Sequence, residues 1–162
     1  MDKPLIACVL LTTHPKRAAY LPDAIRSYRA QTYPNKELLI VNDGEPLRSN
    51  APDIRVVNLV SRPDRWTIGE KRNVGIRMAR GAWLATWDDD DISLGHRLKE
   101  QMRVALNADA DYVLGTSAAV SDESMRVVGH CHRGAIMASA LIRKNAAVVA
   151  GGYSTSSYLE DF

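Results

Sequence analysis

The sequence contains only two cysteines, Cys8 in an apolar run and Cys131 in a distant polar one. Two isolated thiols argue against a disulfide framework and against a cysteine-based zinc site. Long apolar runs are also missing, since none approaches the roughly 20 residues that a membrane-spanning helix requires. The N-terminus, MDKPLIACVLL, has neither the basic segment nor the apolar length of a signal peptide, so a cytoplasmic location is expected.

The sequence also lacks a strong charge of either sign, with 21 basic and 19 acidic residues. This balance gives no argument for a nucleic-acid partner. The local distribution is more informative, because basic residues crowd between Arg62 and Arg80 and an acidic run, residues 88–91, follows closely. A positive region beside a negative one suits a ligand that carries phosphates on a metal ion.

Two glycine-rich signatures are absent. No G-x-G-x-x-G follows the first apolar run and no G-x-x-x-x-G-K-[ST] occurs, which removes the main support for a dinucleotide-binding or P-loop protein. The segment LLTTHPKRAAYLP contains no glycine at all, which argues against a nucleotidyltransferase.

What is present is a regular alternation of apolar strands and amphipathic helices. Buried strands are predicted over residues 5–11, 37–41, 54–60, 82–87 and 112–115, and helices over 21–28, 69–79 and 98–106. Repeats and low-complexity tracts are absent, so we expect one domain spanning residues 1–162. The alternation predicts an α/β fold with a mostly parallel sheet covered by helices. Ligands of such sheets bind beyond the carboxyl ends of the strands.

The acidic run WDDDD directly follows the fourth predicted strand. In an extended stretch Asp88 and Asp90 would point one way, and Asp89 and Asp91 the other. One pair suits Mg²⁺ or Mn²⁺, which prefer oxygen ligands. The alternative is a solvated loop in which Asp91 or Ser93 caps the next helix.

Three other sets of polar residues each allow two interpretations. Lys71 and Arg72 near a helix start suit a phosphate, or belong to a solvated helix face. Asp43, in Asn-Asp-Gly, is a turn residue or an acceptor for the imino group of a uracil. The acidic pair Glu160 and Asp161 is ordinary surface, or carries a catalytic acid on a glycine- and serine-rich loop.

Several of these segments, in this order, resemble the family 2 glycosyltransferases. The matching stretches are the first strand with Thr12, QTYPNKELLIVNDG, GEKRNVGIRMARGAWLATWDDDD, HRLKEQ and GGYSTSSYLED. The resemblance implies the GT-A fold, a Rossmann-like, mostly parallel sheet flanked by helices with a small antiparallel piece near the C-terminus. Family members continue beyond the Glu-Asp pair, so this chain is expected to be short at its C-terminus.

The resemblance also implies roles for individual residues. Thr12 and Asp43 would line the nucleoside pocket, with Asp43 facing the base, and Arg72 would hold the nucleotide. Asp88 would face the ribose, Asp90 would bind Mn²⁺ or Mg²⁺, and Asp161 would be the general base. Further candidates beside these residues are Thr13, Lys71, Asp91 and Glu160.

The expected function is therefore the metal-dependent transfer of a sugar from a nucleoside diphosphate donor to a hydroxyl acceptor, with inversion of the anomeric centre. UDP is the expected nucleotide, and polysaccharide biosynthesis is the expected process. The acceptor could be a saccharide or lipid-linked, which leaves peripheral association with the cytosolic face of a membrane open. The alternative is a nucleotide-sugar binding module without turnover. The sequence does not indicate an oligomeric state.

Overall fold

A computed structural model describes residues 3–115, 118–121, 127–131 and 136–156 of the chain. Within these residues a six-stranded sheet has the order β3-β2-β1-β4-β8-β5. Its strands are β1 (Ile6–Thr12), β2 (Lys36–Asn42), β3 (Ile54–Asn58), β4 (Trp83–Asp88), β5 (Tyr112–Gly115) and β8 (Ile136–Arg143).

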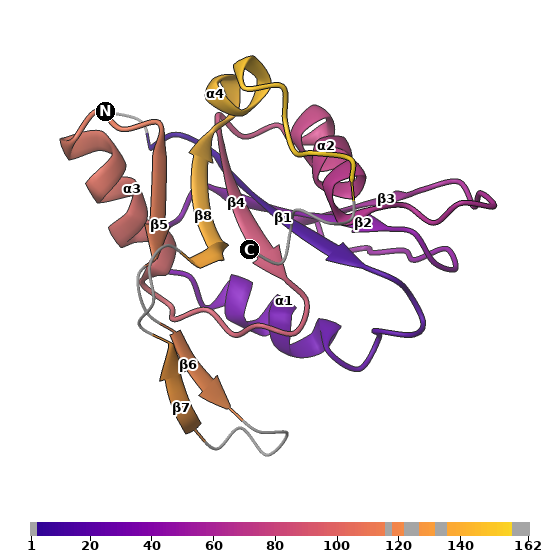
Figure 1. Cartoon of the computed structure of the whole chain (residues 1–162). Helices are drawn as coiled ribbons and strands as arrows, with labels where there is room; N and C mark the ends of the chain where they lie inside the picture. Colours follow the sequence, from indigo (N-terminus) through magenta and orange to yellow (C-terminus); the bar gives the residue numbers. More distant parts are fainter. Residues whose placement is uncertain (1–2, 116–117, 122–126, 132–135, 157–162) are drawn as a thin grey trace.

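The sheet has a parallel half and an antiparallel half. Strand β1 pairs in parallel with both β2 and β4, and β2 pairs in parallel with β3. Strand β8 runs antiparallel to both of its neighbours, β4 and β5. A separate hairpin, β6 (Ala118–Ser121) and β7 (Val127–Cys131), projects below the sheet in Figure 1. The predicted α/β fold with a mostly parallel sheet and a small antiparallel piece is confirmed.

Helices cover both faces of the sheet. Helices α1 (Leu21–Arg29) and α3 (Arg97–Asn107) lie on one face, and α2 (Ile68–Met78) and α4 (Lys144–Val149) on the other (Figure 1). Alternate residues of β1 serve the two cores: Ile6, Cys8 and Leu10 pack towards α1 and α3, while Ala7 and Val9 pack towards α2. Both faces of the strand are thus buried, which explains its continuous apolar sequence.

The predicted elements agree with the observed ones within a few residues. The largest difference is at β3, which ends at Asn58 and not at Val60. Its partner β2 ends at Asn42, so the ladder between the two strands stops at the pair of Asn42 with Asn58. Among the described residues no helix is both long and apolar enough to cross a bilayer.

Candidate functional site

The carboxyl ends of β1, β2 and β4 meet at one edge of the sheet. Thr12 is paired with Asn42 of β2, and Leu11 with Asp88 of β4. Next to these strand ends lies a hollow of about 560 Å³, whose lining includes Thr13 and Asp43. Its basic lining residues are Lys16, Arg17, Arg62, Arg65 and Lys71. Because only Asp43 and Glu45 among its lining residues are acidic, the hollow suits an anionic ligand.

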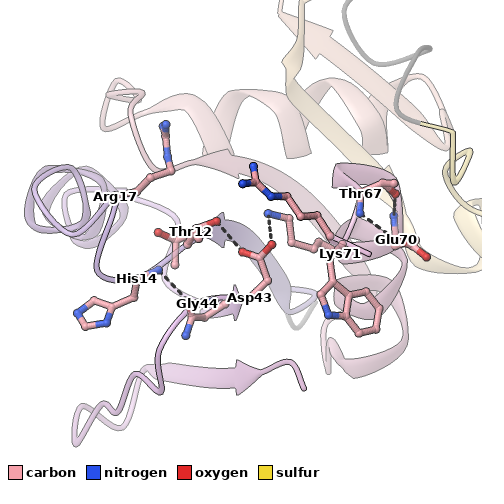
Figure 2. Close-up of polar contacts among 12 residues, drawn as sticks. Thr12, His14, Arg17, Asp43, Gly44, Thr67, Glu70 and Lys71 are labelled. Carbon is pink, nitrogen blue, oxygen red and sulfur yellow. Dashed lines mark hydrogen bonds and ion pairs between the residues drawn. The ribbon is translucent and has the colours of Figure 1, made fainter. Parts of the chain in front are cut away.

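Asp43 is held from two sides at the edge of the hollow. The hydroxyl of Thr13 donates a hydrogen bond of 2.6 Å to Oδ1. On the other side, Nζ of Lys71 lies 3.3 Å from Oδ2 (Figure 2). The side chains of Asp43 and Lys71 are only 13% and 10% exposed. The interpretation of Lys71 as part of a solvated helix face is therefore wrong. A carboxylate has lone pairs beyond these two contacts, so Asp43 can accept another hydrogen bond.

The turn that presents Asp43 is built by its neighbour Asn42. Oδ1 of Asn42 accepts from the backbone amides of His14 and Gly44 at 3.0 and 3.1 Å, and its Nδ2 donates to the carbonyl of Glu45. A Cβ on Gly44 would lie 1.9 Å from the carbonyl oxygen of His14, so only glycine fits this approach. Asn42 and Gly44 make the turn, which leaves the carboxylate of Asp43 available to the hollow.

The start of helix α2 forms the opposite wall of the hollow. Thr67 caps the helix: its hydroxyl accepts from the amide of Glu70 at 3.1 Å, and the Glu70 carboxylate accepts from the amide of Thr67 at 2.8 Å. Arg62 pairs with Glu70 and stacks on the ring of Trp66 at 3.9 Å. The Thr67 amide, and then Arg62, lower the pKa of Glu70. These contacts fix the helix turn that carries Lys71.

The acidic run leaves the strand after its first carboxylate. Strand β4 ends at Asp88 and the next two residues form a turn, so the alternation predicted for an extended stretch is wrong. Asp89 is buried and accepts hydrogen bonds from Thr12 and Arg17, whereas Asp90 is 52% exposed and pairs with the same Arg17. Asp89, absent from the predicted site, is thus the most buried of the four carboxylates.

The alternative interpretation of the acidic loop (residues 88–91), in which Asp91 or Ser93 caps the next helix, is also wrong. Helix α3 begins at Arg97 with His96 as its N-cap. The first-turn amide of Leu98 donates to Oε1 of Gln31, which follows α1, at 3.1 Å. Ser93 instead accepts a hydrogen bond of 2.8 Å from Nη1 of Arg97, whose guanidinium also donates to the carbonyl of Thr86. Neither Asp91 nor Ser93 is therefore needed to start the helix.

Two carboxylates of the run have raised pKa values. Burial raises the pKa of Asp88 to about 6, although Arg72 acts in the opposite direction and the other three aspartates add to the rise. Burial, and then the charge of Asp90, also raise the pKa of Asp91. Retaining these carboxylates costs free energy at neutral pH, which is typical of a functional cluster.

Helix α2 also holds the segment that follows α4. Nδ2 of Asn73 donates to the carbonyl of Tyr153 at 2.8 Å, and Oδ1 accepts from the Tyr153 amide at 2.7 Å. The guanidinium of Arg72 lies 5.1 Å from the Tyr153 ring. Glu160 and Asp161, a few residues further along, lie outside the described residues.

The structure brings most of the predicted site residues to one edge of the sheet. Asp43 contacts both Thr13 and Lys71, while the Thr12 hydroxyl donates to Asp89. The positive charge of Arg72 acts on Asp88 and opposes the rise of its pKa. Sequence reasoning missed Arg17, whose only signal was a basic residue soon after the first strand. Within the described part of the chain, no three histidine, cysteine or acidic side chains converge as a ready-made metal site.

Comparisons with known protein structures identify the fold. In structure, the chain is similar to the mannosyltransferase PcManGT from Pyrobaculum calidifontis in complex with GDP-Man and Mn²⁺, with a TM-score of 0.67, 15% identity, and coverage of 96% of this chain and 49% of that one. It is also similar to S. aureus TarS in complex with UDP-GlcNAc, with a TM-score of 0.66, 16% identity, and coverage of 93% and 48%. The fold is thus the GT-A fold of glycosyltransferases.

Sequence comparison defines the family. The model of glycosyl transferase family 2 matches residues 8–154, and the chain belongs to this family. An uncharacterized glycosyltransferase of Methanocaldococcus jannaschii is 32% identical over 117 residues, covering 66% of this chain and 39% of that protein. GlyG of Streptococcus pneumoniae is 27% identical over 103 residues, covering 59% and 34%. The chain therefore spans less than half the length of each of these relatives.

Proposed function

We propose that this chain binds a nucleoside diphosphate sugar, UDP-linked in the first instance, and transfers the sugar to a hydroxyl acceptor with inversion at the anomeric carbon. The observation that carries the proposal is the basic hollow with Asp43 at its edge, beside the carboxylates that follow β4. A nucleoside diphosphate needs a group that recognises its base, and cations for its phosphates. Both features lie at the strand ends.

Asp43 is suited to recognise the base. Its carboxylate keeps its place through Thr13 and Lys71 and has acceptor capacity left for the imino N–H of uracil. Thymine offers the same imino group, and guanine offers an N–H donor on its Watson–Crick edge. The relatives solved with UDP-GlcNAc and GDP-Man support a nucleotide-sugar donor in general. Asp88 is assigned to the ribose, and Arg72 and Lys71 to the phosphates.

Asp90 is the carboxylate that best fits a divalent metal. It is half exposed, and it already accommodates a cation, since Nη2 of Arg17 lies 2.6 Å from its Oδ2. Mg²⁺ often uses only one or two carboxylates and takes its other ligands from substrate phosphates and water, so three converging protein ligands are not required. When bound, Mn²⁺ or Mg²⁺ would neutralise charge on the departing diphosphate, and Asp91 could assist Asp90 in holding it.

The chemical step needs a base on the acceptor side, and we assign this role to Asp161, with Glu160 beside it, from the family resemblance. Asp161 would take the proton of the acceptor hydroxyl while that oxygen attacks C1 of the sugar from the face opposite the diphosphate. Attack from that face inverts the anomeric carbon. General base catalysis of this kind contributes typically about 10²–10⁴-fold to a rate.

Calorimetric titration with UDP, dTDP and GDP, with and without Mn²⁺, tests the donor site. We expect UDP to bind most tightly and Mn²⁺ to strengthen its binding at least about tenfold, with the Mn²⁺ effect lost in Asp90→Asn. Unchanged affinity for all three nucleotides on adding Mn²⁺ would contradict the proposal.

A second assay separates an enzyme from a binding module. Release of UDP from UDP-sugars, by hydrolysis or transfer, should be abolished in Asp161→Asn while UDP affinity stays nearly unchanged. Tight, manganese-dependent UDP binding without turnover of any UDP-sugar would identify a module that binds the donor only. Equal loss of turnover and of binding in Asp161→Asn would count against its assignment as the base.

A further inference from the structure

Arg17 connects two loops that are far apart in the sequence. It lies between β1 and α1, and it contacts carboxylates 72 and 73 positions further along the chain. Its Nε lies 2.8 Å from both carboxylate oxygens of Asp89, and its Nη2 lies 2.6 Å from Oδ1 of Asp89. The same Nη2 lies 2.6 Å from Oδ2 of Asp90. In Figure 2 the Arg17 side chain points away from Asp43.

The two carboxylates held by Arg17 differ in how easily they can be released. The Asp89 side chain is 4% exposed and, apart from Arg17, accepts a hydrogen bond of 2.9 Å from Thr12. Separating it from Arg17 would leave a buried charge with little compensation. The Asp90 side chain is 52% exposed and contacts Arg17 through one nitrogen, and an exposed ion pair of this kind adds little stability. Arg17 is thus anchored on Asp89 and exchangeable at Asp90.

We propose that Arg17 is the resident cation of the acidic loop and that its guanidinium pairs with Asp90 until a divalent metal displaces it. Asp89 keeps the arginine in place during this exchange. This inference rests on the proposed function, since it takes Asp90 as the metal-binding carboxylate. Arg17 is also one of the residues that line the hollow, so the residue stays beside the ligand site after its guanidinium leaves Asp90. Arg17 is in this account a positioning residue that sets the metal concentration at which donor binding begins.

Arg17→Met removes both the competitor at Asp90 and a positive charge beside the metal. Both changes favour metal binding. The Mn²⁺ concentration that half-saturates UDP binding should therefore fall about threefold to tenfold. Calorimetry measures the midpoint, and the electron paramagnetic resonance signal of free Mn²⁺ reports metal binding directly without any turnover.

Asp89→Asn should act in the opposite direction. It removes the charged anchor, so Arg17 is left to pair with Asp90 alone, and it also removes a negative charge near the metal. The Mn²⁺ midpoint should rise by a similar factor. If Arg17 and Asp89 only maintained the loop structure, both variants would weaken metal binding. Arg103→Met on α3, which breaks an exposed ion pair with Glu100, is the matched control and should leave the midpoint unchanged.

Circular dichroism establishes that each variant folds. Should Arg17→Met fail to fold, Arg17→Lys provides the same test, because lysine is a point charge that cannot span two carboxylates, and its Mn²⁺ midpoint should fall about twofold. An unchanged or higher midpoint in the folded Arg17 variant overturns the inference alone. If Mn²⁺ has no effect on nucleotide binding by the unaltered chain, the proposed function fails and this inference fails with it.

Discussion

Two strand ends at the same edge of the sheet, those of β2 and β4, carry carboxylates whose charges are balanced in different ways. After β2, Asp43 meets Lys71 and Thr13, so one partly buried negative charge has one buried positive charge beside it. After β4, four carboxylates follow one another, and Arg17 is shared between two of them. Burial there raises the pKa of Asp88 to about 6. The first site is thus balanced by one internal pair, whereas the second, with its crowded carboxylates, is the site where we propose an external cation.

Removing Asp43 should have the largest effect on stability. Asp43→Ala leaves the amino group of Lys71, only 10% exposed, without its counter-charge. Breaking a buried pair in this way typically costs about 3 kcal/mol or more. Urea unfolding at pH 7 should show a loss of this size, together with the loss of UDP binding.

The double variant Asp43→Ala/Lys71→Met tests whether the uncompensated charge is the cause. It should recover much of the lost stability, but none of the nucleotide binding. Asp53→Ala serves as the matched control, since Asp53 pairs at 3.5 Å with the exposed Arg29, and it should cost less than about 0.5 kcal/mol. A stability loss below 1 kcal/mol for Asp43→Ala would show that the two strand ends do not differ as described.

Asp88→Asn should change stability in the opposite direction. The pKa of Asp88 is about 6 in the folded chain, against an ordinary value of 3.8. Between these values the folded state holds a proton that the unfolded state has lost, so the stability of the wild-type chain falls as the pH rises through this window. At pH 7.5 the variant should be more stable by up to about 3 kcal/mol, and below pH 4 the gain should vanish.

Urea midpoints between pH 4 and pH 7.5 measure this effect. Arg72 opposes the rise in the pKa of Asp88, whereas Asp89, Asp90 and Asp91 increase it. High salt screens these charges, so the larger contribution of burial to the raised pKa should remain. Asp109→Asn, at a side chain that is 99% exposed, is the control and should show no pH-dependent gain. If Asp88→Asn is destabilising at pH 7.5, the acidic loop is not strained by its own charge.

The sequence predicted the parallel half of the fold better than the antiparallel half. The buried strands β1, β2 and β4 are continuous apolar runs, whereas β8 (IMASALIR) mixes small and polar residues and pairs with strands far away in the chain. The chemical groups of the candidate site could be proposed from residue type, as for Asp43 and Lys71. Their partners could not, because the contact of Arg17 with Asp89 depends on two loops 72 positions apart.

Thr67→Ala should have the smallest effect and act on one of the two sites only. Loss of the hydroxyl that caps α2 should cost about 1 kcal/mol of stability. Thr32→Ala is the matched control, because Thr32 is an exposed threonine outside the helices. Because Lys71 lies one turn after the cap, loosening the helix start should weaken UDP binding severalfold without Mn²⁺. The Mn²⁺ midpoint depends on the acidic loop and should stay constant, so a shifted midpoint would mean that the two strand ends are coupled through α2.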